Sequence, residues 1–120
     1  MYEYRAIVTK VYDGDTITVE IDLGFNAWQK GIDLRLYGIN APEVRLGRRT
    51  TAADKKRGLK ARDWLLEQIL GKQVILRTYR DKKGKFGRYL AEVYPADVAL
   101  GTTSYNAQLV DLGLAEWKEY

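Results

Sequence analysis

The chain has 120 residues, and we expect residues 1–120 to form a single domain around one hydrophobic core. It contains no Cys and no His, which excludes disulfides, cysteine-based zinc sites and imidazole-based catalysis. Its net charge of +4 is unevenly spread, because residues 45–62 and 77–88 hold fourteen of the twenty basic residues and two of the sixteen acidic ones. Positive charge clustered in this way suggests a polyanion partner, although plain solvated surface segments have the same composition.

The first eight residues contain no apolar run long enough for a signal peptide or a membrane span. We therefore expect no membrane association. The expected location is cytoplasmic for the chain as written, or secreted if a leader has been removed. Both faces of most predicted strands are used within the fold, so a monomer is expected.

The chain is predicted to begin with two strands. Residues 4–11 are rich in β-forming side chains and end at Asp13-Gly14, a strong hairpin signal. The segment after the turn alternates apolar and polar residues, which predicts a half-buried strand. Its core-facing residues are expected to be Ile17, Val19, Ile21 and Leu23.

A loop is predicted over residues 24–31, in which Phe25 and Trp28 are expected to pack against the protein rather than contact a ligand. Residues 32–39 are predicted to form the third strand. The alternation of this strand places Arg35 on the face opposite its apolar residues, where its side chain can line a cleft.

After a basic loop over residues 44–51, the pattern predicts a helix that ends near Leu70, with Gly71 as its stop signal. Small and apolar residues spaced three and four apart give this helix one packing face. They are Gly58, Ala61, Leu65 and Ile69. The two small residues would allow the helix to approach a neighbouring element closely.

A second strand pair is predicted over residues 73–79 and 89–94, followed by a short helix from Ser104 to Gly113 and a strand-and-turn tail. Five strands, with one helix after the third and another near the end, indicate an α+β fold. The pattern suits the five-stranded Greek-key β-barrel known as the OB-fold, with two to three helices.

Acidic and arginine side chains recur in three short stretches, residues 12–16, 35–43 and 86–88. Carboxylates can hold a hard cation and activate water, and two arginines can neutralise a phosphate. Together these are the requirements of metal-assisted phosphodiester cleavage. Taken separately, each stretch also fits a plain turn or a surface ion pair.

The residues and spacing of these stretches resemble the staphylococcal (micrococcal) nuclease family over nearly the whole chain. The resemblance implies a calcium-dependent nuclease, with another divalent cation as an option, that hydrolyses DNA or RNA with little sequence specificity. It implies that Asp15 binds the metal and that Arg35 and Arg88 bind the scissile phosphate. It also implies that Glu43 is the general base.

Three positions differ from the family pattern. Asn40 stands where the family commonly has Asp as a second metal ligand; its amide oxygen can still bind Ca²⁺, but one negative charge is lost, so weaker metal binding is expected. Ala41 replaces a Thr that contributes its backbone carbonyl, a contact that Ala can also make. Phe86 replaces a Tyr whose hydroxyl helps to bind a terminal phosphate.

Basic side chains in two segments are predicted to guide the polyanion to the site and to make binding salt-dependent: Arg48, Arg49, Lys83 and Lys85. Phe86 is a further candidate for substrate contact, and Asp33 is a minor candidate for additional negative charge beside Arg35. Asn40 supports an alternative, a non-catalytic nucleic-acid-binding module with an altered metal site. A third interpretation is a protein-interaction module with incidental basic charge.

Overall fold

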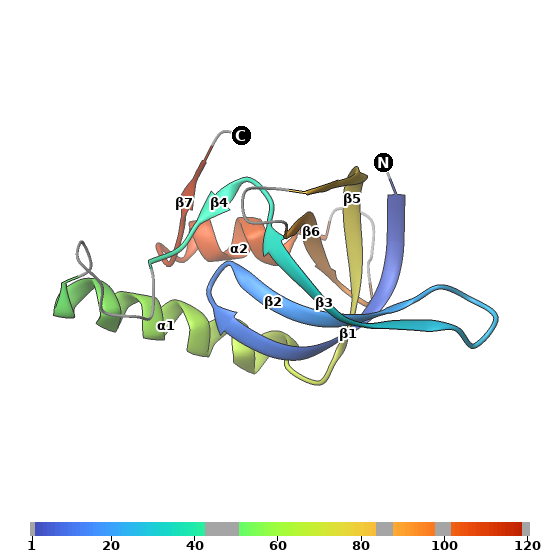
Figure 1. The fold of residues 1–120 in the computed structure, drawn as a ribbon. Coiled ribbons are helices and arrows are strands. Elements are labelled where there is room, and N and C mark those ends of the chain that lie inside the picture. Colours follow the sequence, from blue (N-terminus) through green and yellow to red (C-terminus); the bar gives the residue numbers. More distant parts are fainter. Residues whose placement is uncertain (1, 43–50, 84–87, 98–101, 119–120) are drawn as a thin grey trace.

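The computed structural model describes residues 2–42, 51–83, 88–97 and 102–118, apart from the side chains of residues 79–83. A closed barrel is formed in the order β1-β2-β3-β6-β5 by β1 (Tyr2–Asp13), β2 (Thr16–Asp22), β3 (Trp28–Leu36), β5 (Gln73–Lys83) and β6 (Tyr89–Pro95). The short strands β4 (Ile39–Asn40) and β7 (Glu116–Trp117) pair with each other, and the helices are α1 (Ala52–Ile69) and α2 (Tyr105–Asp111). This confirms the predicted five-stranded barrel (Figure 1). Within the described ranges, neither helix is long and apolar enough to cross a membrane.

The barrel closes through one parallel pair, β3 with β6, whereas the other barrel strands pair antiparallel. In the parallel pair, Leu34 lies opposite Tyr89 and Arg35 opposite Leu90. Arg88 directly precedes β6, the strand that pairs with the one that carries Arg35. The pairing brings two arginines that are distant in the sequence to neighbouring segments of the chain.

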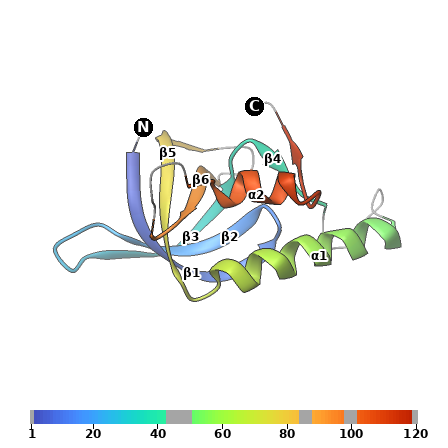
Figure 2. The ribbon, with the colours of Figure 1, turned by 180° about the vertical axis from the view of Figure 1, so that it is seen from behind.

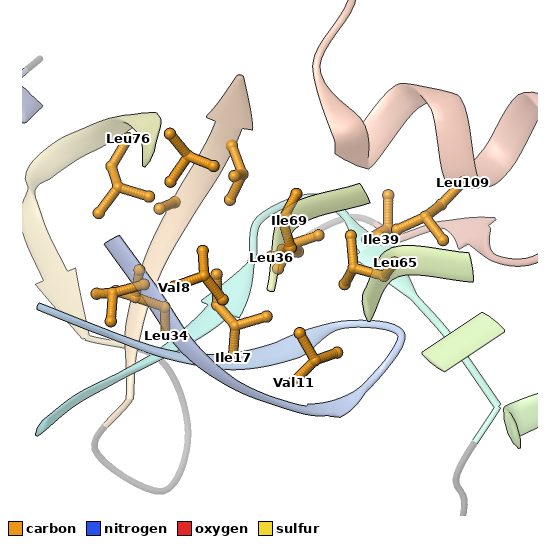
Figure 3. Close-up of a cluster of buried hydrophobic side chains, with 14 of the residues drawn as sticks. Val8, Val11, Ile17, Leu34, Leu36, Ile39, Leu65, Ile69, Leu76 and Leu109 are labelled. Atoms are coloured by element: carbon orange, nitrogen blue, oxygen red, sulfur yellow. The ribbon is translucent and has the colours of Figure 1, made fainter. Parts of the chain in front are cut away.

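The apolar core fills the barrel and the space between the barrel and the helices (Figure 3). The predicted packing face of α1 is confirmed, because Gly58, Ala61, Leu65 and Ile69 are its buried residues. Three of the residues predicted to face the core from β2, Ile17, Val19 and Ile21, are buried or partly buried. The fourth, Leu23, lies beyond the strand and is about half exposed. Burial of this core is the main source of stability in such a fold.

The hairpin that joins β2 and β3 differs from the prediction in extent and in exposure. The predicted loop over 24–31 is wrong, since β3 already begins at Trp28 and the turn centres on Phe25 and Asn26. The expectation that Phe25 and Trp28 pack is also wrong, because Phe25 is fully exposed and Trp28 is 40% exposed. The hairpin projects away from the barrel, so the core does not reach its tip (Figure 2).

Helix α1 packs against the turn between β1 and β2. The turn residues are Gly14 and Asp15 rather than Asp13 and Gly14, since Asp13 pairs with Thr16. A side chain on Gly14 would place its Cβ 2.8 Å from the Cβ of Ala61 and 2.9 Å from that of Ala41. The helix thus approaches as closely as the sequence predicted, and it does so next to Asp15.

The predicted third strand, 32–39, is in fact two strands separated by a bend. β3 ends at Leu36, Tyr37 and Gly38 form a turn with Gly38 at φ 80°, and β4 follows. A glycine is favoured here because an L side chain is strained at this φ. The bend turns the chain so that residues after β3 lie beside residues before β2.

Candidate functional site

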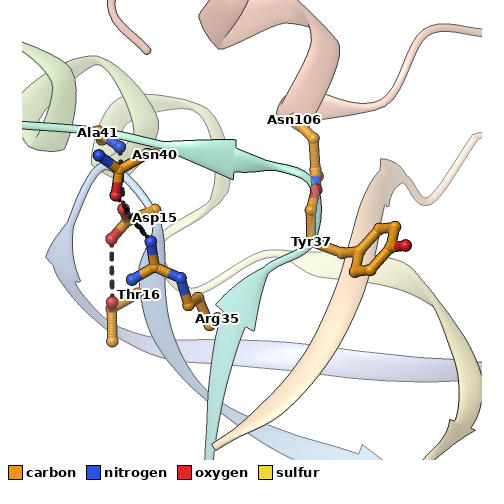
Figure 4. A network of polar contacts seen from close by, with 7 residues as sticks. All are labelled: Asp15, Thr16, Arg35, Tyr37, Asn40, Ala41 and Asn106. Carbon is orange, nitrogen blue, oxygen red and sulfur yellow. Dashed lines mark hydrogen bonds and ion pairs between the residues drawn. The ribbon is translucent and has the colours of Figure 1, made fainter. Parts of the chain in front are cut away.

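Five polar or small residues from separate parts of the chain meet at the end of the barrel where β1 turns into β2 (Figure 4). Asp15 and Thr16 come from that turn, Arg35 from the end of β3, and Asn40 and Ala41 from β4 and the residue after it. The barrel topology accounts for this meeting, because Thr16 and Arg35 are register partners on adjacent strands. The family resemblance implied that Asp15, Arg35, Asn40 and Ala41 belong to one site, and the structure brings them together with Thr16.

Asp15 is the buried acid of the site, with 3% of its surface exposed. Its Oδ1 accepts a hydrogen bond from the Thr16 hydroxyl at 3.1 Å, and its Oδ2 accepts one from the Ala41 backbone N–H at 2.9 Å. A buried carboxylate needs such donors because burial removes its hydration. These contacts hold both oxygens in fixed positions.

Arg35 supplies positive charge at the same point. Its Nη2 lies 3.3 Å from Asp15 Oδ2 and donates a hydrogen bond to Asn40 Oδ1 at 2.9 Å. Its side chain is 20% exposed, so the guanidinium retains access to solvent. One nitrogen atom therefore bridges the carboxylate of Asp15 and the amide oxygen of Asn40.

The backbone around these side chains is also fixed. The Leu36 N–H donates to the Asp15 carbonyl at 2.8 Å, which ties the β1–β2 turn to the end of β3. On the other side of the bend, the Lys118 N–H donates to the Gly38 carbonyl at 2.7 Å, and β7 pairs with β4. The site is thus held by tertiary contacts on both sides, which favours precise placement of its groups.

Asn106 of α2 supports the bend from behind. Its Nδ2 donates to the Tyr37 carbonyl at 2.8 Å and to the Ala91 carbonyl at 3.2 Å, and its Oδ1 accepts from the Val93 N–H at 3.0 Å. Its side chain is almost completely buried. Asn106 therefore fixes the bend between Arg35 and Asn40.

The donor set suits a hard cation. Asp15 Oδ2 and Asn40 Oδ1 both lie close to one cationic nitrogen, so the two oxygens already surround a position that positive charge occupies. Ca²⁺ accepts carboxylate and amide oxygens in irregular geometry, which these residues can provide. No group of three or more acidic, His or Cys side chains suited to a metal occurs among the described residues. The two described candidates for metal ligands, Asp15 and Asn40, therefore carry one negative charge between them.

Arg88, the second predicted phosphate-binding arginine, is half-buried at the start of β6. The residue after it, Tyr89, lines the mouth of the barrel together with Leu34. Arg88 itself precedes the strand, whose pairing with β3 begins at Tyr89 and Leu34. The two arginines therefore lie on neighbouring segments of the chain, Arg35 in β3 and Arg88 directly before β6.

Several predicted site residues lie outside the described part of the chain: Glu43, Arg48, Arg49, Lys85 and Phe86. Lys83 is described only through its backbone, which pairs with Tyr89 at the end of β5. Asp33, the minor acidic candidate, accepts a hydrogen bond from the Thr18 hydroxyl at 2.8 Å. The roles predicted for these residues stay predictions.

A cavity of about 490 Å³ opens beside the site. It lies between Asn40 and the residues after it, α1, and the segment that leads into β7, and its walls include Arg57 and Lys60. Asp54, on the same wall, has its pKa lowered, mainly because Arg57 donates a hydrogen bond to it. The sequence identified Arg57 and Lys60 only as part of a basic segment, because nothing in their local pattern shows that α1 runs past Asn40.

A family model described as staphylococcal nuclease homologue matches residues 33–120 of the chain. A thermonuclease of Staphylococcus hyicus is 31% identical over 113 residues, covering 94% of this chain and 59% of the thermonuclease. A thermonuclease of Staphylococcus intermedius is 31% identical over 116 residues, with 95% and 60% covered. An uncharacterized protein of Methanocaldococcus jannaschii is 30% identical over 127 aligned residues, with 93% and 58% covered. The chain thus spans less than two thirds of the length of these relatives.

Proposed function

The chain belongs to the staphylococcal nuclease family, and from this premise we propose that it is a metal-dependent nuclease. Its proposed substrates are DNA or RNA, hydrolysed with little sequence specificity, and its proposed metal ion is Ca²⁺. The observation that carries the proposal is the convergence of Asp15, Asn40 and Arg35 at one point. A buried carboxylate, a second oxygen ligand and a phosphate-binding cation are the groups that this chemistry requires.

Asp15 and Asn40 would hold the ion through their side-chain oxygens, and Ala41 through its backbone carbonyl. When bound, Ca²⁺ supplies positive charge that neutralises a phosphate and lowers the pKa of coordinated water. Thr16 and the Ala41 N–H keep Asp15 oriented, since each donates to one of its oxygens. Such contacts from neighbouring residues typically set ligand geometry and metal affinity.

The remaining roles belong to side chains that act on the phosphate and on water. Arg35 in β3 and Arg88 directly before the paired strand β6 would donate hydrogen bonds to phosphate oxygens and balance the charge that grows in the transition state. Glu43 would accept a proton from the attacking water as general base. The clustered basic residues, together with Arg57 and Lys60 beside Asn40, would attract the polyanion electrostatically.

The test is cleavage of single-stranded and duplex DNA, and of RNA, at low salt with Ca²⁺ or with EDTA. We expect cleavage with Ca²⁺ only, and a fall of about 10²–10⁴-fold in rate for Glu43→Gln. Glu67→Gln on α1 is the control, because it removes the same type of charge from an exposed position. Cleavage that continues in EDTA or is unchanged in Glu43→Gln would contradict the proposal.

Asn40 favours a second candidate function, a nucleic-acid-binding module that does not cleave. The neutral amide leaves the described metal ligands with a single negative charge, that of Asp15, which is already paired with Arg35. This candidate predicts salt-dependent binding of DNA or RNA without cleavage at any Ca²⁺ concentration. Restoration of cleavage by Asn40→Asp would then show that the missing charge is the cause.

A further inference from the structure

We propose that Arg35 is an internal cation that competes with the divalent metal ion for Asp15 and Asn40, and thereby sets the metal affinity of the site. The inference rests on the proposed function for the position of the metal site. It goes further by giving a residue expected to bind phosphate a second role. Removal of that residue should strengthen metal binding, whereas a role in phosphate binding alone predicts no such gain.

The geometry supports direct competition. Arg35 Nη2 lies within 3.3 Å of Asp15 Oδ2 and 2.9 Å of Asn40 Oδ1, the two side-chain oxygens proposed to bind the ion. Ca²⁺ binds oxygen at roughly 2.3–2.6 Å, so an ion bound to both oxygens would lie close to the position of this nitrogen. The guanidinium and the ion cannot both use that position, and their positive charges repel each other.

The charge balance of this chain favours Arg35 in the competition. Asp15 is nearly completely buried, and its carboxylate requires a compensating charge, which Arg35 supplies. Asn40 is neutral, so among the described residues the guanidinium of Arg35 balances the charge of Asp15. A second carboxylate at position 40 would leave one negative charge over for a divalent ion, and the amide removes that advantage.

Arg35 is also able to leave. Its side chain is 20% exposed, and it extends from the last residues of β3 at the edge of the site. Once an ion neutralises Asp15, the Nη2 donor is released from Asp15 and Asn40 and can serve a phosphate oxygen instead. We therefore infer that metal binding precedes the engagement of phosphate by Arg35.

The test is a Ca²⁺ titration by calorimetry in the absence of nucleic acid, with the parent protein, Arg35→Gln and Arg35→Lys. We expect Arg35→Gln to bind Ca²⁺ about tenfold more tightly than the parent, since the competing cation is gone. Arg35→Lys, which keeps a cation, should remain closer to the parent. Affinity in Arg35→Gln that is equal to or weaker than in the parent would overturn the inference.

Arg77→Gln is the matched control for net charge. Arg77 pairs with Glu3 at 3.2 Å, near the opposite end of β1 from Asp15, so its loss changes the total charge equally without touching the site. Its effect on Ca²⁺ affinity should stay below about twofold, because salt screens distant surface charges. If Arg77→Gln raises the Ca²⁺ affinity as much as Arg35→Gln does, the effect is one of net charge alone, and the inference is overturned.

The design separates this inference from the proposed function. If the parent binds Ca²⁺ and cleaves DNA but Arg35→Gln binds no more tightly, only the competition is wrong. If neither the parent nor Arg35→Gln binds Ca²⁺, the metal site itself is wrong. If the parent does not bind and Arg35→Gln does, the competition is supported.

Arg35→Gln leaves a buried carboxylate without its counter-ion, so a second measurement uses the parent protein alone. The side-chain N–H signals of Arg35 can be followed by NMR during addition of Ca²⁺, with Arg35→Lys providing their assignment. We expect these signals to shift and to exchange faster with water as the ion binds. Signals that stay unchanged at saturating Ca²⁺ would show that Arg35 keeps its contacts, contrary to the inference.

Discussion

Strand β2 connects two hairpin turns that are built in different ways. At one end, Gly14 and Asp15 are buried against α1, and side-chain and backbone donors fix the carboxylate. At the other end, Phe25 and Asn26 both have positive φ, 54° and 61°, and the Phe25 side chain is fully exposed. The candidate site lies at the end that is held by tertiary packing, and the end that relies on local turn geometry carries none of the site residues. The placement of reactive groups therefore depends on what packs against a turn more than on the turn itself.

The largest expected effect concerns Asn106, which supports the site end through three hydrogen bonds. Asn106→Ala would remove the acceptor of the Val93 N–H and the donor to the Tyr37 and Ala91 carbonyls, and we expect a loss of about 3 kcal/mol in the free energy of unfolding. Urea denaturation measures this loss. Gln108→Ala on the same helix is the control, because Gln108 makes an exposed hydrogen bond to the Thr103 carbonyl and should cost below about 1 kcal/mol.

An equal, small loss of unfolding free energy in the Asn106→Ala and Gln108→Ala variants would contradict the contrast between the two ends of β2. The bend would then not depend on tertiary support. A large loss in Asn106→Ala together with weaker Ca²⁺ binding would sharpen it. That result would show that the bend positions Asn40 as well as stabilising the fold.

The next effect compares a glycine from each turn. Gly14→Ala should cost about 1–3 kcal/mol, because its Cβ would meet the Cβ atoms of Ala61 and Ala41. Gly24→Ala meets no atom within 4 Å, but Gly24 has φ 80°, so its cost of roughly 1–2 kcal/mol is backbone strain. Urea denaturation gives both values, and Ca²⁺ titration should show weaker binding in Gly14→Ala alone.

A second substitution distinguishes the two causes. In an Ala61→Gly background, the cost of Gly14→Ala should fall, since one of the two contacts is removed. The cost of Gly24→Ala should be the same in both backgrounds. Equal costs of Gly14→Ala in the two backgrounds would show that α1 does not restrain the turn.

The smallest effect is expected where α1 begins. Asp54 accepts hydrogen bonds from Arg57 and from the Thr51 backbone N–H. These contacts, chiefly the one with Arg57, lower the pKa of Asp54 below its ordinary value of 3.8. A lowered pKa means that the folded protein favours the carboxylate, so this contribution is present above pH 3.8 and is lost as the pH falls further. Asp54→Asn should slightly destabilise the protein at neutral pH.

Urea denaturation of parent and Asp54→Asn at neutral pH and at about pH 3 tests this sign. The difference between the two proteins should shrink in acid. A difference that grows in acid would mean that the neutral carboxyl group, rather than the carboxylate, stabilises the helix start.

The strands and the packing face of α1 could be predicted from regular spacing in the sequence, and the family resemblance supported their arrangement as a barrel. Ile17 and Val19 alternate with polar residues, and Leu65 and Ile69 are four apart, so each pattern reports one element and one face. The grouping of Asp15 with Arg35 and Asn40 also followed from the sequence, through the family resemblance. Strand pairing between Thr16 and Arg35 supplies its physical basis.

Other features depend on contacts that no local pattern contains. Asp13-Gly14 indicated the correct hairpin but the wrong turn residues, because Asp13 pairs with Thr16 and the turn falls on Gly14 and Asp15. Phe25 was expected to pack, since aromatic residues usually do, yet the hairpin projects beyond the core. Arg35 can bridge Asp15 and Asn40 only because the chain bends after β3. The sequence pattern had predicted a continuous strand at this place.

The most direct test of the central claim is the Ca²⁺ dependence of cleavage in the parent protein and in Asn40→Asp, measured on the same single-stranded DNA. If Asp15, Asn40 and Arg35 form a metal-dependent nuclease site, cleavage requires Ca²⁺, and Asn40→Asp reaches half-maximal rate at a lower Ca²⁺ concentration. The added carboxylate supplies a second negative charge to the metal site, which has only that of Asp15 among the described ligands of the parent. Cleavage by neither protein at any Ca²⁺ concentration would contradict the claim and leave the fold as a nucleic-acid-binding module.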